Sequence, residues 1–305
     1  MTVHSSAQPV SVQRGLFAAI AAYGLWGLLP LYFRALHDVP PLELVGWRVV
    51  WTVPVCLAII AFRKQGPDLR AAFANRPVLA MLGLSAALIA VNWLIFVIAI
   101  NNGHVLATSL GYYINPLLNV LLGTMFLGER LSRVQWCAVA LAGAGIALLL
   151  GGAVDTLAIA LSLAVTFAGY GFVRKQVPVG AVPGLTVETL LLFIPAVIVV
   201  FLAAFSPQGS SMAMGGKVTP LLAMAGLATG LPLLLFAVAA RALPLSTLGF
   251  CQFLAPTISF VLGLTVFGET LDTPRLVCFV LIWLAIALYS WDMWRQSRTV
   301  GQAPA

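Results

Sequence analysis

The chain has 305 residues, of which 61% are hydrophobic and 8% are charged, a composition that excludes a water-soluble globular protein and indicates an integral membrane protein. Its net charge of +7 would suit nucleic acid, but no basic run carries a binding motif, so we expect a lipid bilayer and no nucleic acid as partner. The four cysteines lie in apolar runs without metal-binding spacing, and they predict no metal site.

Ten apolar stretches follow one another along the chain, each with about the 20 residues that a helix needs to cross a bilayer. The run after Arg14 is too long for the apolar core of a signal peptide and lacks a small-residue cleavage site, so we treat it as a retained span. The sequence predicts an all-α integral membrane protein with ten transmembrane helices, at 15–33, 42–62, 77–99, 105–127, 132–150, 156–173, 185–204, 219–240, 245–267 and 274–291.

The basic residues predict the orientation of these spans. Twelve Lys and Arg residues fall in the segments on one side, among them Arg174 and Lys175, which we assign to a loop. Three fall on the other side, and Arg48 is the one basic residue that we place well inside a span. Because cytoplasmic loops carry the excess of positive charge, we expect cytoplasmic termini at 1–14 and 292–305.

The stretch LGYYINPLLNVLLGTMFLGE at 110–129 is repeated 140 residues later as FCQFLAPTISFVLGLTVFGE at 250–269. Repetition of this kind predicts two related halves, at 15–150 and 156–291. Since each half holds five predicted helices, an odd number, the second enters the membrane upside down. This inverted five-plus-five repeat is typical of secondary transporters, whose binding sites lie between the halves near the midplane.

The repeated helix carries a polar face. Tyr112, Asn115 and Asn119 recur at helical spacing, and the second copy keeps Gln252 and Ser259 in register. An unpaired amide in hydrocarbon costs several kcal/mol, so the face must meet a wet cavity or another helix. Both interpretations stay open: substrate contact, or hydrogen bonding that holds helices together.

A proline lies on each copy of this helix, Pro116 in the first and Pro256 in the second. Because proline has no amide hydrogen, each leaves the carbonyl four residues earlier, of Tyr112 or Gln252, without its helical partner. We predict a hinge at each proline. The alternative is a kink that shapes packing and nothing more.

Several further side chains are candidates for the site. Arg48 either reaches the membrane surface or points into the bundle to meet an anion. Glu43 and Glu188 are repeat counterparts near the starts of the second and seventh spans. Either would couple transport to protons if it is buried, and a solvated glutamate at a helix end is the alternative. The remaining candidates for substrate contact are Asn92, Tyr23 and Trp26, the last two also being suited to aromatic packing.

The run NNGHVLATSLGYYINPLLNVLLGTMFLGERL at 101–131, the opening YGLWGLLPLYF at 23–33 and two proline-containing helices that each end in Gly-Glu resemble the RarD group of permeases, in the EamA part of the drug/metabolite transporter superfamily. The resemblance covers nearly the whole chain. It implies an inner-membrane protein with an inverted five-plus-five repeat, a group usually described as chloramphenicol-sensitivity or drug permeases. It also implies that Arg48 points into the interior.

No Walker, HExxH, G-x-S-x-G or Rossmann pattern occurs in a matching context, so we expect no enzyme activity, no catalytic residue and no cofactor. We expect a permease for a small organic solute, with a cavity lined by the first, third, fourth, sixth, eighth and ninth spans. The alternative is a membrane-embedded scaffold or sensor without transport, and a homodimer is left open. The predicted substrate contacts are Tyr112, Asn115, Asn119, Gln252, Ser259, Asn92, Arg48, Tyr23 and Trp26, with Glu43 and Glu188 as coupling residues.

Overall fold

The computed structural model describes residues 11–101, 105–150, 154–207, 209–267 and 273–300, and every regular element in these ranges is helical. This confirms the all-α prediction. Eight segments of the described chain are long and apolar enough to cross a membrane, and 133–148 forms a shorter apolar helix. The count of ten spans stays a prediction. The eight segments are Val12–Ala35, Pro41–Phe62, Arg76–Ala99, Leu157–Gln176, Ala181–Ala204, Val218–Ala242, Leu245–Thr265 and Leu276–Gln296.

The helices of the first half are α1 (Val12–Ala35), α2 (Pro41–Phe62), α3 (Gly66–Ala74), α4 (Arg76–Asn101), α5 (Val105–Phe126) and α6 (Arg133–Leu150). Those of the second half are α7 (Val154–Gln176), α8 (Ala181–Ala204), the 3₁₀ helix η1 (Ser211–Ala213), α9 (Val218–Ala223), α10 (Ala225–Ala242), α11 (Leu245–Gln252), α12 (Leu254–Thr265) and α13 (Thr273–Val300).

The prolines explain two of the boundaries. Pro41 occupies the first turn of α2, where its missing amide hydrogen costs nothing. In the ninth predicted span, the helix breaks at Phe253, three residues before Pro256, and divides into α11 and α12. Pro116 instead lies inside one continuous helix, α5. The two repeated prolines therefore act differently on their helices.

The largest correction concerns the end of α7. The sequence predicts that this span ends at residue 173, but the helix continues to Gln176. Arg174 and Lys175 thus belong to its last turn, so their assignment to a loop is wrong, and the side chain of Arg174 is 1% exposed. Arg48 is therefore not the one basic side chain enclosed by the bundle.

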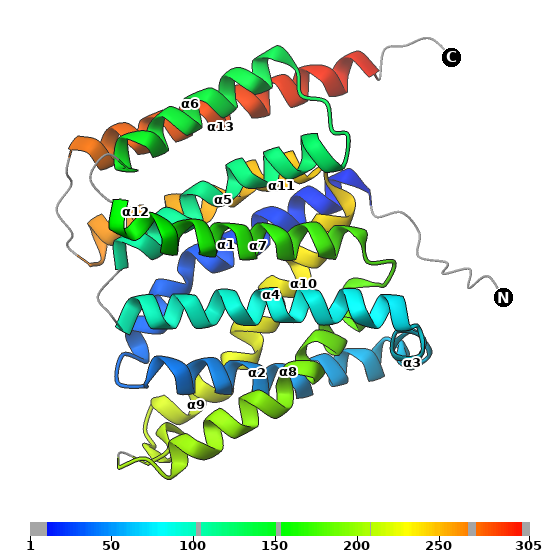
Figure 1. Ribbon diagram of the computed structural model, residues 1–305, viewed down its shortest axis with the longest axis vertical. Helices are drawn as coiled ribbons and strands as arrows, with labels where there is room; N and C mark the ends of the chain where they lie inside the picture. Colours follow the sequence, from blue (N-terminus) through cyan, green and yellow to red (C-terminus); the bar gives the residue numbers. More distant parts are fainter. Residues whose placement is uncertain (1–10, 102–104, 151–153, 208, 268–272, 301–305) are drawn as a thin grey trace.

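Figure 1 shows α6 and α13 side by side at one end of the long axis, α2, α8 and α9 at the other, and the remaining long helices between them. The most extensive packing joins helices of different halves, as in α5 with α7 and α2 with α8. In the repeat, α1 corresponds to α7 and α4 corresponds to α10. The contact between α1 and α10 therefore has a counterpart in the contact between α7 and α4, and both contacts are present. Such pairing is what two repeated halves predict, and their inversion relative to the membrane stays a prediction.

Small residues allow α2 and α10 to approach each other closely. A Cβ atom on Gly226 would collide with the backbone of Trp51, so the glycine is required at this crossing. Next to it, the Thr52 hydroxyl lies 2.6 Å from the carbonyl of Arg48, to which it donates, and 3.3 Å from that of Gly226. The crossing therefore fixes the middle of α2 against the start of α10.

Candidate functional site

The polar faces of α5 and α11 meet without a gap. Asn119 Nδ2 donates to Gln252 Oε1 at 3.1 Å, and a Cβ atom on Gly249 would lie 2.7 Å from the Pro116 carbonyl oxygen. Asn115 Nδ2 lies 3.4 Å from the carbonyl oxygen of Ala164 on α7. These contacts are those of residues that hold helices together. Substrate contact at Asn115, Asn119 and Gln252 stays a prediction that requires α5 and α11 to separate.

The other predicted contact residues are spread over the bundle. Ser259 Oγ donates to the carbonyl of Gly27 at 3.3 Å, and Asn92 Nδ2 donates to the carbonyl of Leu163 at 2.9 Å. The ring of Tyr112 lies 6.1 Å from that of Phe96, centroid to centroid. The structure thus does not bring these side chains together with the Asn119 pair at one cavity.

Tyr23 and Trp26 belong to an aromatic cluster in the middle of the molecule. Both contact Phe236 of α10, with ring centroids 6.3 Å and 5.7 Å away, and Tyr170 of α7 stacks on the same ring at 5.6 Å. The Tyr23 side chain is buried. In this conformation Tyr23 and Trp26 therefore serve aromatic packing, which was the alternative to substrate contact. The same cluster holds the ring of Tyr170 in place.

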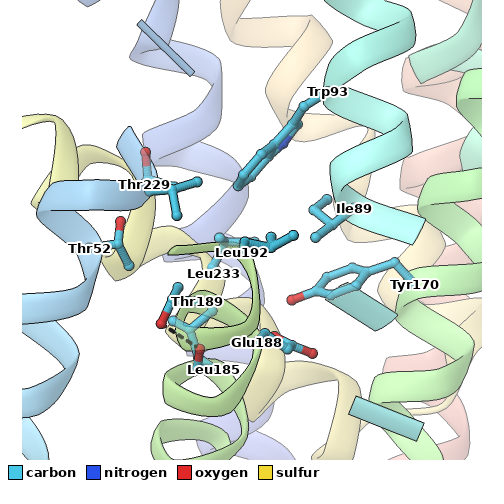
Figure 2. A pocket seen from close by; sticks show the side chains of 11 residues that line it. Thr52, Ile89, Trp93, Tyr170, Leu185, Glu188, Thr189, Leu192, Thr229 and Leu233 are labelled. Carbon is cyan, nitrogen blue, oxygen red and sulfur yellow. Dashed lines mark hydrogen bonds between the residues drawn. The ribbon is translucent and has the colours of Figure 1, made fainter. Parts of the chain in front are cut away.

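A small internal cavity lies next to Tyr170 of this cluster, between α2, α4, α7, α8 and α10. Its volume is about 10 Å³, close to the least that holds one water molecule. In Figure 2 the Tyr170 hydroxyl points toward this space, with Glu188 below it and Trp93 above. The lining residues are Val49, Thr52, Ile89, Trp93, Tyr170, Leu185, Glu188, Thr189, Leu192, Thr229 and Leu233.

The lining of this cavity differs from the lining predicted for a transport cavity. The third, sixth and eighth predicted spans contribute to it as α4, α7 and α10, but so do α2 and α8, which the sequence did not place there. No residue of α1, α5 or α12 lines it. The physical reason is that the bulky rings of α1 and the direct contact of α5 with α11 fill the space that those helices were expected to enclose.

Glu188 is a buried carboxylate, 2% exposed, in the wall of this cavity. Its Oε1 accepts a short hydrogen bond from the Ser85 hydroxyl of α4 and lies 3.6 Å from Nη1 of Arg174, too far for a hydrogen bond. Its Oε2 has no hydrogen-bond partner among the described residues. The Tyr170 hydroxyl lies close to the carboxylate as well. The carboxylate is therefore held by one well-formed hydrogen bond, with a second hydroxyl nearby to which it can turn.

Arg174 reaches Glu188 because α8 has a glycine opposite it. A Cβ atom on Gly184 would collide with the guanidinium group, so a larger residue would push it away. Nη2 donates to the carbonyl of Ala181 at 3.3 Å, while Nε and Nη1 have no hydrogen-bond partner among the described residues. A buried ion pair repays its desolvation when its geometry is excellent, and this geometry is poor.

Arg48 points into the bundle, as the resemblance implied. Its Nε donates to the Thr229 hydroxyl at 2.8 Å, and the guanidinium carbon lies 5.0 Å from the ring centroid of Trp93 and 5.7 Å from that of Phe33. Because Thr229 and Trp93 both line the cavity, Arg48 places a positive charge next to it.

Glu43 is buried as deeply as Glu188 but is fully bonded. Its Oε1 accepts from Trp47 Nε1 at 3.1 Å, from Ser210 Oγ at 3.2 Å and from the Ser211 amide at 2.9 Å, and its Oε2 accepts from Ser211 Oγ at 2.6 Å. Trp47 belongs to α2 itself, and the other three donors belong to Ser210 and Ser211, in the segment between α8 and α9. Glu43 thus holds that segment against α2, and its coupling role stays an untested prediction.

The sequence identified Glu188 and Arg48 but missed the residues that complete their surroundings: Ser85, Thr52, Thr229 and Arg174. Each is a polar residue in a long apolar helix, which is a usable signal. What the sequence does not contain is the pairing in space, since Ser85 lies 103 residues from Glu188. Among the described residues, no cluster of three His, Cys, Asp or Glu side chains suits a metal ion.

Comparison with known proteins supports a membrane function for this arrangement. Residues 13–151 match the EamA-like transporter family. An uncharacterized transporter of Pseudomonas aeruginosa is 42% identical over 292 residues, 96% of this chain and 98% of that protein. The RarD protein of Salmonella typhimurium is 42% identical over 280 residues, 92% and 95% of the two chains. A solved structure titled "Crystal structure of protein" shares the fold, with a TM-score of 0.71, 22% identity and coverage of 91% of this chain and 97% of that one.

Proposed function

Because this chain belongs to the RarD group of the EamA-like transporter family and is a multi-pass membrane transporter, we propose that it moves a small organic solute by alternating access between two inverted halves. The observation that carries the proposal is the cavity at Glu188, which is lined by helices of both halves. An intramembrane carboxylate with an unpartnered oxygen is costly, and such groups commonly mark transport pathways.

In the proposed cycle this conformation is assigned to a closed state, since the cavity is too small for an organic solute. Contacts between the halves are present toward both ends of the bundle. On the predicted outer side, the Tyr32 hydroxyl donates to the carbonyl of Leu221 at 2.9 Å. On the predicted cytoplasmic side, Glu129 accepts from the amides of Leu245 and Ser246 at 2.5 and 2.9 Å. Access from either side requires one of these sets to open.

The chemistry of the lining defines the class of solute. Trp93 and Tyr170 offer aromatic surface, Thr52 and Thr229 offer hydroxyls, and Arg48 lies beside them. Mild hydrogen-bonding groups between aromatic walls suit a small aromatic or amphipathic solute. A multiply charged anion fits poorly next to the Glu188 carboxylate, and the described residues offer no metal site.

Glu188 provides a route for proton coupling. When a proton binds Oε2, the carboxyl group becomes neutral and its attraction to Arg174 is lost, which weakens the contact between α7 and α8. When the proton leaves, the ion pair forms again and draws the two helices together. Exchange of a proton for the solute at this cavity would thus alternate between two packings of the same helices.

A binding screen followed by a flux measurement tests the proposal. Purified protein is tested for thermal stabilisation by a library of small aromatic and amphipathic solutes. The first is chloramphenicol, because the RarD group is usually described as chloramphenicol-sensitivity or drug permeases. For a solute that stabilises the protein, uptake into proteoliposomes is then measured. The cavity variant is Thr229→Val, and the matched control is Thr265→Val, at an exposed threonine. We expect uptake that the cavity variant lowers and the control leaves unchanged. Binding without uptake would favour the sensor alternative.

A further inference from the structure

A second concave site lies on the membrane-facing side of α2, α8 and α10, and the proposed transport function does not use it. It is a groove of about 530 Å³, open to the surroundings. Ten residues line it, nine of which are apolar: Ala58, Ile59, Phe62, Ala181, Val182, Leu231, Leu234, Leu235 and Val238, the tenth being Arg63. An apolar groove on a membrane protein is filled by hydrocarbon in the cell, so its occupant is a lipid chain or an amphipathic molecule.

The charge at one end of the groove selects among such occupants. Arg63 is the one charged residue among those that line it, and no described residue pairs with the guanidinium group through a hydrogen bond or a salt bridge. Its side chain is exposed at the end of α2, on the predicted cytoplasmic side. The first turn of α8, which borders the same groove at Ala181 and Val182, contains no acidic residue to compensate this charge.

A second basic residue, Lys64, follows Arg63 at the end of α2. Lys64 has a positive φ of 55°, a conformation in which glycine is the usual residue after a helix end. The helix end is otherwise regular, since the Gln65 amide donates to the Ile60 carbonyl at 2.9 Å. Lys64 is exposed and does not line the groove, so the end of α2 carries a second basic residue directly after Arg63.

We propose that this groove is a binding site for an anionic phospholipid of the cytoplasmic leaflet, with an acyl chain along α2, α8 and α10 and the headgroup phosphate on Arg63. Basic side chains at the cytoplasmic end of a groove between membrane helices are suited to anionic headgroups. A zwitterionic lipid fills the same groove with its chain but gains nothing from Arg63.

The site lies directly behind the wall of the transport cavity. On α10, Leu233 lines the cavity and its neighbour Leu234 lines the groove. On α8, Leu185 lines the cavity and Val182, one turn earlier, lines the groove. A bound chain therefore packs against α2, α8 and α10, three of the five helices that line the cavity. We expect the lipid to stabilise this closed packing.

Native mass spectrometry of the full chain in detergent tests the proposal, with phosphatidylglycerol and phosphatidylcholine of identical acyl chains as probes. The wild type should retain phosphatidylglycerol more tightly than phosphatidylcholine. Arg63→Gln should weaken the binding of phosphatidylglycerol about fivefold, which is the effect of one basic side chain near an anionic headgroup. The binding of phosphatidylcholine should stay unchanged. Arg70→Gln is the matched control, because Arg70 is an exposed cation of α3 outside the groove.

Ala58→Trp tests the groove itself by filling it from α2, and Leu57→Trp, on the exposed neighbouring position outside the groove, is its control. We expect Ala58→Trp to lower retention of both lipids and Leu57→Trp to lower neither. Equal retention of the two lipids by the wild type, or equal effects of Arg63→Gln and Arg70→Gln, would overturn the assignment. So would an Ala58→Trp variant that keeps both lipids and loses solute uptake, since the groove would then be a solute entrance.

Discussion

Glu43 and Glu188 are counterparts in the two halves, 145 residues apart, each near the start of its helix and each 2% exposed. The two carboxylate oxygens of Glu43 accept four hydrogen bonds, and Ser211 donates two of these four. Glu188 has one well-formed hydroxyl donor, Ser85, a distant guanidinium group and the Tyr170 hydroxyl close by, and its Oε2 has no hydrogen-bond partner of good geometry among the described residues.

The two glutamates therefore differ in how many hydrogen bonds hold them in place. A carboxylate surrounded by donors is firmly placed, since moving it breaks several hydrogen bonds at once. A carboxylate with a free oxygen at a cavity can accept a proton at low cost to its neighbours. We infer that the first half uses its glutamate to fix a loop and the second uses its counterpart to respond to protons.

Removing Arg174 should give the largest effect, because it leaves a buried carboxylate without a positive partner. We expect Arg174→Met to lower the free energy of unfolding by about 3–5 kcal/mol. The measurement is the thermal unfolding midpoint in nanodiscs. Adding Glu188→Gln to the same chain should restore most of the loss, since no unpaired charge then remains. A double variant as unstable as Arg174→Met would contradict the pairing.

Glu43→Gln should have the next largest effect. The amide group of glutamine carries two donors of its own, and one of them would face the Ser211 hydroxyl and amide. We expect a loss of about 1.5–3 kcal/mol in the free energy of unfolding, the range for hydrogen bonds to a charged group. The pH dependence of solute uptake should stay that of the wild type. If it disappears, the two glutamates do not differ in function as proposed.

Ser85→Ala should have the smallest effect of the three. It removes the hydroxyl that donates to Glu188 and leaves Arg174 in place. We expect a loss of about 1 kcal/mol in the free energy of unfolding and a shift, but no loss, of the pH dependence of uptake. The control is Ser162→Ala, an exposed serine of α7. Loss of all pH dependence in Ser85→Ala would mean that the serine, and not the free oxygen, determines proton binding.

The sequence predicted the membrane class and the helical fold, because composition and long apolar runs determine both. It also predicted a polar face on each repeated helix and left open whether that face meets a cavity or another helix, and in the structure Asn119 binds Gln252. It could not predict that they meet without a gap, since this depends on how closely the backbone at Gly249 approaches Pro116. Nor could it distinguish Glu43 from Glu188, whose partners Ser211 and Ser85 lie 168 and 103 residues away.

Infrared difference spectroscopy of carboxyl groups tests the central claim most directly, since it needs no solute. The purified protein is titrated in nanodiscs, and the carbonyl stretch of protonated carboxylic acids is followed as the pH changes. We expect a buried-acid band that appears as the pH falls, disappears in Glu188→Gln and persists in Glu43→Gln. A band that survives in Glu188→Gln, or one that is lost in Glu43→Gln, would contradict the assignment of proton binding to Glu188.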